Sequence, residues 1–325
     1  MARADLLLGL VKTGVEGDIT LFRKTAEAIA AEEHAKQHFV LAERLNNILQ
    51  QSKTANTVNS GMTNDPDLQN AFYSVKPRKS LSDLVLSETI TQSCMDFIQE
   101  HHRRDLLRSY NLEPRHRLLL EGAPGNGKTS LAEAFANELM LPFYVVKYEG
   151  VIGSYLGETA KTLDKLFDFI KGQRCVVFFD EFDAIAKERN DSSDVGEVKR
   201  VVNSLLKQID MLPSHVVVIA ATNHQGMLDD AIWRRFQLQL ELPKPTKKMA
   251  IKWIEAFEKR VGHDLGYAAS TLAEKLLGLS YSEFEDFTLD VQRQYVLALP
   301  SSEGKIKAIT SRCLKIRTNR SKPEV

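Results

Sequence analysis

The sequence contains the stretch Gly122-Ala123-Pro124-Gly125-Asn126-Gly127-Lys128-Thr129, which fits the phosphate-binding loop pattern G-x-x-x-x-G-K-[ST] at every fixed position. Residues 117–121, just before it, include the short apolar run that a buried parallel strand leaves in a sequence. Residues 130–139, just after it, carry apolar side chains at helical spacing. A strand, a glycine-rich loop and a helix in this order predict a phosphate site. The alternative is a glycine-rich turn that binds nothing.

The residue types of this loop suit the chemistry of a nucleotide phosphate. Glycines let successive backbone N–H groups turn toward phosphate oxygens, and the N-terminus of the following helix adds partial positive charge. We expect Lys128 to reach the β- and γ-phosphates and the Thr129 hydroxyl to ligate Mg²⁺.

The bulk composition is that of an ordinary globular protein. The 325 residues are enough for two domains with a small appendage, and 43 basic residues balance 43 acidic ones. This balance gives no overall field toward nucleic acid or a membrane surface. The three cysteines are far apart and form no metal or redox spacing, which suits a reducing compartment. The apolar run 6–11 is too short to span a bilayer, so we expect a soluble, cytoplasmic protein.

Shifts in composition divide the chain into four parts. We predict a helical N-terminal domain over 1–52, a linker over 53–79, an α/β domain over 80–243 and a helical lid domain over 244–325. The N-terminal domain shows apolar residues at helical spacing, namely Phe22, Ala26, Ile29 and Ala30. Its role is either packing on the main body or binding a partner.

The α/β domain alternates strand and helix patterns. Strand candidates are 117–121, 143–146, 175–179, 215–223 and 237–243, the last being an edge strand closed by proline. Helix candidates are 87–110, 130–139 and 159–171. This alternation predicts a mostly parallel, doubly wound sheet. The lid candidates are 247–261, 271–277, 282–297 and 304–316.

Polar side chains follow two of the buried strands. Asp180 and Glu181 end the apolar run 175–179, which places both carboxylates at the edge where parallel sheets bind ligands. One acid can hold Mg²⁺ and the other can activate the attacking water as a general base. Asn223, at the end of another strand, can orient water or the γ-phosphate. The alternatives are two solvated acids and an asparagine that begins a turn.

The C-terminal stretch 305–322 holds seven Lys or Arg residues and no acid. We interpret it as a solvated helix face, with nucleic-acid binding as the alternative.

These motifs, in this order and spacing, resemble the AAA+ ATPases over residues 80–300, and most of all the FtsH, spastin and katanin branch. In that resemblance 122–129 is Walker A, Asp180 and Glu181 belong to Walker B, and Asn223 is sensor 1. The resemblance implies a P-loop α/β ATPase domain with a helical lid, and ATP hydrolysis with ATP and Mg²⁺ as cofactors.

Two further segments resemble those that flank the adenine in this family. They are the lid segment 278–283, which contains Ser280, and the segment Asp83-Leu84-Val85, where Leu86 replaces the usual glycine. Asn126 stands where the family usually has Thr or Ser. The nucleotide-binding residues so predicted are Gly122, Pro124, Gly125, Asn126, Gly127, Lys128, Thr129, Ser130, Asp83, Leu84 and Ser280, with Thr129 and Asp180 toward the metal.

Arg234 and Arg235 resemble the arginine pair that, in this branch, reaches the γ-phosphate bound by the neighbouring subunit. The resemblance therefore implies a homo-oligomeric ring, typically a hexamer. Structurally, either arginine can instead pair with Asp229 or Asp230, and the two interpretations can coexist.

The segment 154–158 resembles the family's pore loop, with Tyr155, Leu156 and Gly157 as the residues that grip an unfolded polypeptide. An aromatic ring can wedge against a chain of any sequence, and glycine lets the loop flex. Tyr155 can alternatively be a buried residue at the start of the next helix.

The predicted function is an ATP-hydrolysing ring motor that remodels, unfolds or threads protein substrates. No zinc-protease motif follows, so a separate protease is a candidate partner, as in the bacterial ATPases paired with subtilisin-like proteases that this layout resembles. The alternatives are a nucleotide-gated module that loads DNA or another partner, and a small-molecule kinase that uses the same phosphate loop.

Overall fold

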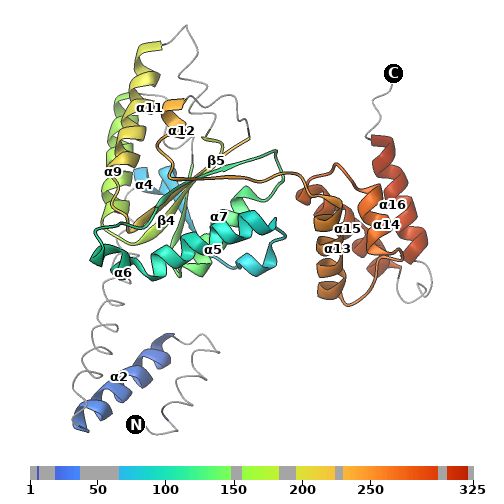
Figure 1. Ribbon diagram of the computed structural model, residues 1–325, viewed down its shortest axis with the longest axis horizontal. Helices are drawn as coiled ribbons and strands as arrows, with labels where there is room; N and C mark the ends of the chain where they lie inside the picture. The colour runs from blue at the N-terminus through green and yellow to red at the C-terminus, as the bar shows by residue number, and fades with distance from the viewer. Residues whose placement is uncertain are drawn as a thin grey trace. The chain divides into compact units, whose positions relative to one another are not determined.

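A computed structural model of the chain describes residues 6, 19–36, 66–147, 156–182, 195–223, 230–298 and 306–320 (Figure 1). The chain divides into two compact units, Met1–Gln69 and Asn70–Val325. In the first unit, helix α2 (Ile19–Ala35) buries Ala26, Ile29 and Ala30, whereas Phe22, at the N-terminal end of the same helical face, is 39% exposed. None of the helices in the described ranges is both long enough and apolar enough to cross a membrane.

The second unit contains a six-stranded sheet in the order β1-β3-β4-β5-β2-β6. The strands are β1 (Phe72–Val75), β2 (Arg117–Glu121), β3 (Phe143–Val146), β4 (Cys175–Phe179), β5 (Val216–Thr222) and β6 (Leu238–Glu241). All neighbours pair in parallel except β1, which is antiparallel to β3. The predicted doubly wound, mostly parallel sheet is confirmed. Strands β3, β4 and β5 are buried along their whole length, as expected for strands covered on both faces.

Strand β1 lies inside the stretch 53–79, which the sequence predicts to be a linker. Its four residues are too few to show a periodic pattern, and Tyr73 is 46% exposed. Phe72 is nevertheless buried and makes an edge-to-face contact with Tyr144 of β3, with 5.2 Å between the ring centroids. The sheet therefore gains an antiparallel edge strand from the residues just before the α/β domain.

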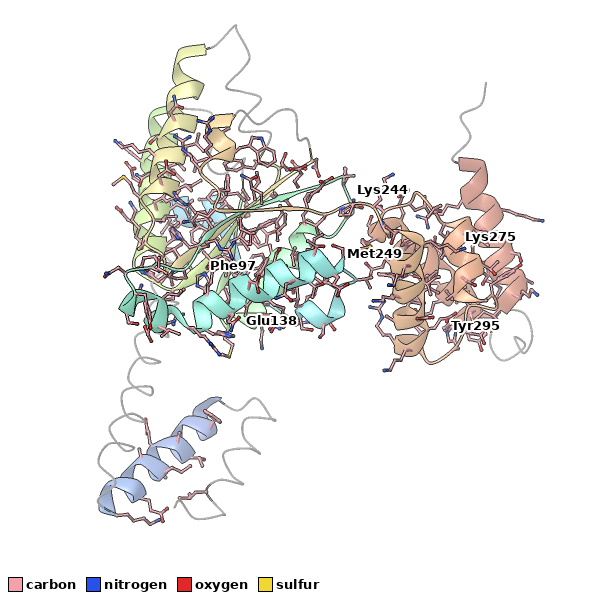
Figure 2. All side chains as sticks on the ribbon, in the orientation of Figure 1. Phe97, Glu138, Lys244, Met249, Lys275 and Tyr295 are labelled. Atoms are coloured by element: carbon pink, nitrogen blue, oxygen red, sulfur yellow. The ribbon has the colours of Figure 1, made fainter. Side chains whose placement is uncertain are left out.

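Helices cover both faces of the sheet (Figure 1). On one face, α5 (Glu88–His102) and α7 (Lys128–Glu138) share a hydrophobic core with strands β2 to β6. Phe97 of α5, labelled in Figure 2, meets Phe135 of α7 in this core. On the other face lie α9 (Leu156–Lys171) and α11 (Val195–Asp210), followed in the chain by the short helix α12 (Asp230–Trp233). The helix predicted over 87–110 is interrupted at Arg103, and α6 (Arg104–Ser109) follows.

The C-terminal helices form the predicted lid around a core of their own. They are α13 (Lys247–Val261), α14 (Ala269–Lys275), α15 (Tyr281–Leu297) and α16 (Ile306–Arg320). The Thr246 hydroxyl caps α13 and Gly262 ends it in a left-handed conformation. Helix α14 begins two residues before the predicted range 271–277. Lys244 lies in the connection between β6 and α13 (Figure 2).

Candidate active site

Strand order brings the predicted catalytic segments to one edge of the sheet. The phosphate loop follows β2, Asp180 and Glu181 follow β4, and Asn223 follows β5. Strand β5 lies between β4 and β2, and all three run parallel, so their carboxyl ends meet at the same edge. Asn223 therefore lies between the loop and the two acids.

Two glycines in the loop occupy positions that a side chain could not share. Gly122 has φ 144°, and a Cβ there would lie 2.3 Å from the carbonyl oxygen of Leu242. Gly125 has φ 77°, and its Cβ would lie 2.8 Å from the hydroxyl oxygens of Ser280 and Ser282. The loop can therefore pack tightly against the end of β6 and the start of α15 only because both residues are glycine.

Lys128 lies at the centre of this site, with its side chain largely buried. Its ammonium donates hydrogen bonds to the carbonyl oxygens of Gly122 (2.7 Å) and Ala123 (3.2 Å) and to Asn223 Oδ1 (2.7 Å). The structure thus brings together two residues that the sequence singled out separately. An ammonium held this way among loop carbonyls can take phosphate oxygens as acceptors in their place.

Thr129 and Asp180 are in contact as well. The Thr129 hydroxyl donates to Asp180 Oδ2 over 3.2 Å. A hydroxyl and a carboxylate side by side are the oxygen ligands that Mg²⁺ prefers, so the residues present fit this ion. Within the described residues, no cluster of three His, Cys, Asp or Glu side chains could hold a metal by itself. Thr129 and Asp180 would supply two of the oxygen ligands of such an ion.

Glu181 has an unusual backbone for a glutamate, with φ 49°. A left-handed conformation of this kind costs about 1 to 3 kcal/mol and persists where the surroundings impose it. Here the Glu181 N–H donates to Asp180 Oδ1 over 2.9 Å, which fixes the turn directly after β4. The Glu181 side chain is exposed at the sheet edge.

Asn126 connects the loop to the end of β6. Its side chain is 2% exposed, and Nδ2 donates to the Leu242 carbonyl over 3.0 Å. The same carbonyl faces Gly122, and the Leu242 N–H donates to Glu121 O over 2.7 Å. The phosphate loop is therefore bound to the strand that continues into the lid.

The lid contacts the loop directly. The Ser282 N–H, at the start of α15, donates to Gly125 O over 3.0 Å, and Ser280 caps that helix together with Glu283. The Tyr281 hydroxyl donates to Val85 O over 2.7 Å. Burial raises the pKa of Tyr281 to about 12, so the hydroxyl keeps the proton that it donates. The two segments predicted to flank the adenine thus lie in contact.

The other predicted nucleotide residues have their own surroundings. Asp83 accepts from the Ser80 N–H (2.7 Å) and hydroxyl (2.8 Å), and these hydrogen bonds lower its pKa. Leu84 packs against the main core. Ser130 accepts from Lys79 Nζ over 2.7 Å. Pro124 is exposed at the tip of the loop.

The arginine pair follows α12, and Arg235 binds an acid at the end of another helix. Arg235 Nε donates to Asp210 Oδ2 over 2.9 Å, and Arg117 Nη1 donates to Asp210 Oδ1 over 2.8 Å. Asp229 lies outside the described residues and the side chain of Asp230 is not described. Arg117 is the first residue of β2, whereas the phosphate loop follows its last residue. Arg235 is therefore anchored at the opposite edge of the sheet from its own phosphate loop.

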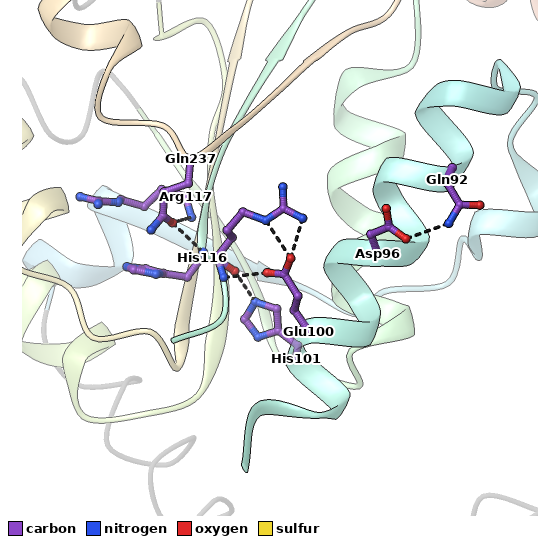
Figure 3. A network of polar contacts seen from close by, with 8 residues as sticks. Gln92, Asp96, Glu100, His101, His116, Arg117 and Gln237 are labelled. Carbon is purple, nitrogen blue, oxygen red and sulfur yellow. Dashed lines mark hydrogen bonds and ion pairs between the residues drawn. The ribbon is translucent and has the colours of Figure 1, made fainter. Parts of the chain in front are cut away.

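A polar network holds that opposite edge together (Figure 3). Gln237 Oε1 accepts from the N–H groups of His116 (2.9 Å) and Arg117 (3.1 Å), and the Gln237 N–H donates to Arg117 O (2.9 Å). Arg115 pairs with Glu100 of α5, and its carbonyl contacts His101 Nε2 over 2.7 Å. The start of β2 is thus fixed both to α5 and to the segment that carries the arginines.

His101 in this network predicts a loss of stability in acid. Burial lowers the pKa of His101 to about 4, although its hydrogen bond to Arg115 opposes that shift. The unfolded chain takes up this proton near its ordinary value of 6.5, so stability falls as pH falls from 6.5 toward 4. We expect this group to remove about 2 kcal/mol of unfolding free energy between pH 7.5 and pH 5.

Urea unfolding of His101→Asn at both pH values measures that effect. Asparagine does not titrate, so the stability of this variant should change less between the two pH values. His102→Asn, on the exposed neighbour, is the matched control. The pKa of His116 is also lowered by burial, but His116 is present in all three proteins. Equal pH dependence in wild type and His101→Asn would contradict the assignment.

The predicted pore-loop residues lie at the edge of what is described. Tyr155 falls outside the described residues, so neither of its two interpretations is settled. Helix α9 begins at Leu156, so Leu156 and Gly157 form its first turn rather than a loop.

Several residues that make contacts at the two edges of the sheet could not be identified as functional from the sequence. Asp210, Gln237 and Tyr281 make contacts that join segments far apart in the chain, such as the 93 positions between Arg117 and Asp210. The Leu242 carbonyl acts through the backbone, which carries no residue signal. Asp210 is the last residue of α11 (Val195–Asp210), a helix that is not among those predicted from the sequence.

Comparison with known proteins places these features in a family. The model of the "ATPase family associated with various cellular activities (AAA)" matches residues 118–244, from β2 to just beyond β6. A protein of Sinorhizobium fredii named "Uncharacterized AAA family ATPase y4kL" is 38% identical over 291 residues, covering 88% of this chain and 87% of that protein.

Longer relatives match over part of their length. The cell division cycle protein 48 homolog of Archaeoglobus fulgidus is 36% identical over 56% of this chain and 25% of its own length. The ATP-dependent zinc metalloprotease FtsH 3 of Sphaerobacter thermophilus is 37% identical over 52% of this chain and 36% of its own length. This chain therefore aligns with about a third or less of each of these two relatives.

Proposed function

This chain belongs to the AAA ATPase family and hydrolyses ATP, and on that premise we propose that it is a homo-oligomeric ring motor that remodels, unfolds or threads protein substrates. The observation that carries the ring is the anchoring of Arg235 at the sheet edge opposite its own phosphate loop. The five residues of β2 separate those edges by roughly 16 Å. A guanidinium carried by this arginine pair at that edge can serve a nucleotide bound by a second copy better than its own.

In the pocket of one copy, we assign each role to a side chain whose position suits it. Lys128 binds the β- and γ-phosphates, and Thr129 and Asp180 would hold Mg²⁺. The chemistry that bound Mg²⁺ supplies is neutralisation of charge on the phosphate oxygens. Glu181 accepts the proton of the attacking water, and Asn223, already bonded to Lys128, senses the γ-phosphate.

The lid contacts the α/β domain next to the phosphate loop. The Ser282 N–H binds the loop at Gly125 O and the Tyr281 hydroxyl binds Val85 O, so the start of α15 contacts both the phosphate loop and the segment 83–85. We propose that Asp83, Leu84 and Ser280 border the nucleotide base there. A chain that binds ATP between the α/β domain and a lid can convert hydrolysis into lid motion.

A polypeptide substrate is supported by the resemblance of the segment 154–158 to a pore loop. One relative is named as an ATP-dependent protease, in which ATP use and a protein substrate go together. Tyr155 is proposed as the residue that contacts the substrate chain, and a separate protease as a candidate partner.

Three cations of the basic stretch at the C-terminus have partners inside the lid. Lys307 lies over the ring of Tyr267 at 5.3 Å, and Arg312 binds Gln294. Arg317 approaches Asp286 at 3.9 Å. These cations of α16 therefore make contacts within the lid, which supports the interpretation as a helix face that stabilises the lid.

Stimulation of ATP turnover by an unfolded protein tests the motor proposal. We expect β-casein to raise phosphate release by the wild-type ring, and Tyr155→Ala to lose that stimulation factor while Tyr155→Phe keeps it. Double-stranded DNA and small hydroxyl compounds serve as the comparison probes. Stimulation by DNA alone, or phosphate transfer to a small molecule, would instead support one of the rival functions.

A further inference from the structure

The two arginines that follow α12 are held differently. Arg235 is partly buried and bonded to Asp210, whereas Arg234 is exposed. The Arg235 N–H donates to Ile232 O and the Phe236 N–H to Trp233 O, so the pair lies in a tight turn. That turn sets the side chains of consecutive residues in different directions.

The residues on both sides of this turn are anchored. Phe236 is 4% exposed and meets Phe182 edge to face, with 5.7 Å between ring centroids. Gln237 is bound to the start of β2 by three hydrogen bonds (Figure 3). The backbone that carries the arginines is therefore fixed to the sheet. A movement of this backbone cannot compensate for a change in the Asp210 contact.

Asp210, the last residue of α11, binds two cations at once. Its two carboxylate oxygens each accept from a different guanidinium, Arg117 at 2.8 Å and Arg235 at 2.9 Å. The Arg117 side chain is 19% exposed and that of Arg235 is 31% exposed. A carboxylate shared in this way keeps two like charges close together and fixes the guanidinium of Arg235 through its Nε.

We propose that the two arginines divide the work in the composite site. Arg234 is the catalytic guanidinium presented to the neighbour's γ-phosphate, and Arg235 is a positioning residue that Asp210 and Arg117 hold at the sheet edge. This inference rests on the proposed function, because it needs a second copy whose nucleotide faces the arginine-bearing edge.

The division of work predicts unequal effects of substitution on turnover at saturating ATP. Arg234→Ala should lower kcat about 10³-fold or more, because a finger supplied in trans contributes that much. Arg235→Ala and Asp210→Asn should each lower kcat about 10- to 100-fold, the effect of misplacing a catalytic group. Their combination should be no worse than either alone, because both remove the same contact. KM for ATP should stay near wild type in all three.

Lysine substitutions separate positioning from catalysis. Arg235→Lys keeps a cation for Asp210 and should recover most of the activity, whereas Arg234→Lys loses the guanidinium fork and should not. Thermal melting and light scattering with ATP, on each variant, show that the chain is folded and the ring is present.

The outcomes distinguish this inference from the proposed function. Non-additive losses at Asp210 and Arg235, with rescue by lysine at 235 alone, support the division of work. If Arg235→Ala is as inactive as Arg234→Ala, is not rescued by lysine and adds fully to Asp210→Asn, Arg235 is itself a catalytic finger and the inference is wrong while the ring stands. If both alanine variants turn over ATP like wild type, the composite site itself is wrong.

Discussion

Replacing Glu181 with glutamine is expected to lower ATP turnover about 10²- to 10⁴-fold, the range that general-base catalysis contributes. The substitution keeps the size of the side chain and the backbone turn in which the Glu181 N–H binds Asp180. It removes only the proton acceptor. The pocket of Lys128, Thr129 and Asn223 is untouched, so the variant should still bind ATP and should retain it.

Phosphate release measures the expected loss of turnover. Retention of radiolabelled ATP on a filter measures the expected binding of ATP. Light scattering with ATP should show the ring of the variant as stable as that of wild type, or more so. Glu285→Gln, an exposed carboxylate on lid helix α15, is the matched control and should turn over normally. Unchanged turnover in Glu181→Gln would refute the base assignment.

Replacing Arg234 with alanine should have a larger effect, a loss of about 10³- to 10⁵-fold in kcat if the guanidinium acts across a subunit interface. The loss comes from uncompensated charge on the γ-phosphate in the transition state. ATP affinity should change little, because each copy's own loop, Lys128 and lid contacts remain. A surface ion pair, by contrast, is worth about 0 to 1 kcal/mol and could not produce such a loss.

Steady-state kinetics over a range of protein concentration measure this effect, because a site shared by two copies also loses activity on dilution. Arg293→Ala is the control, since Arg293 is an exposed arginine of the lid paired with Asp290. Activity of wild type that is independent of dilution, together with normal turnover in Arg234→Ala, would speak against a shared site.

Much of the α/β fold could be predicted from the sequence because its strands are buried on both faces. Apolar runs such as 175–179 and 216–222 carry that signature, and they were found at nearly their observed positions. Strand β1 could not be found, because four residues at an edge, one of them an exposed tyrosine, leave no pattern. The break at Arg103 likewise has no proline or glycine to mark it.

The phosphate site could be predicted because its residues lie in local motifs whose strands end at one edge. The contacts that connect the site to the rest of the chain could not be predicted from the sequence. Asn126 and Leu242 are 116 positions apart, and Tyr281 and Val85 are 196 apart, so their contacts depend on the folded topology. The pairing of Arg235 with Asp210, 25 positions earlier in the chain, has the same origin.

Mixing two inactive variants tests the composite site most directly. Glu181→Gln lacks the base but keeps its arginines, and Arg234→Ala lacks the finger but keeps its pocket. In rings assembled from equal amounts of both, about one interface in four joins an intact pocket to an intact finger. We predict that the mixture recovers roughly a quarter of wild-type turnover, although neither variant is active alone. A mixture that forms mixed rings, shown by co-purification of differently tagged chains, and stays as inactive as its components would contradict a pocket built from two copies.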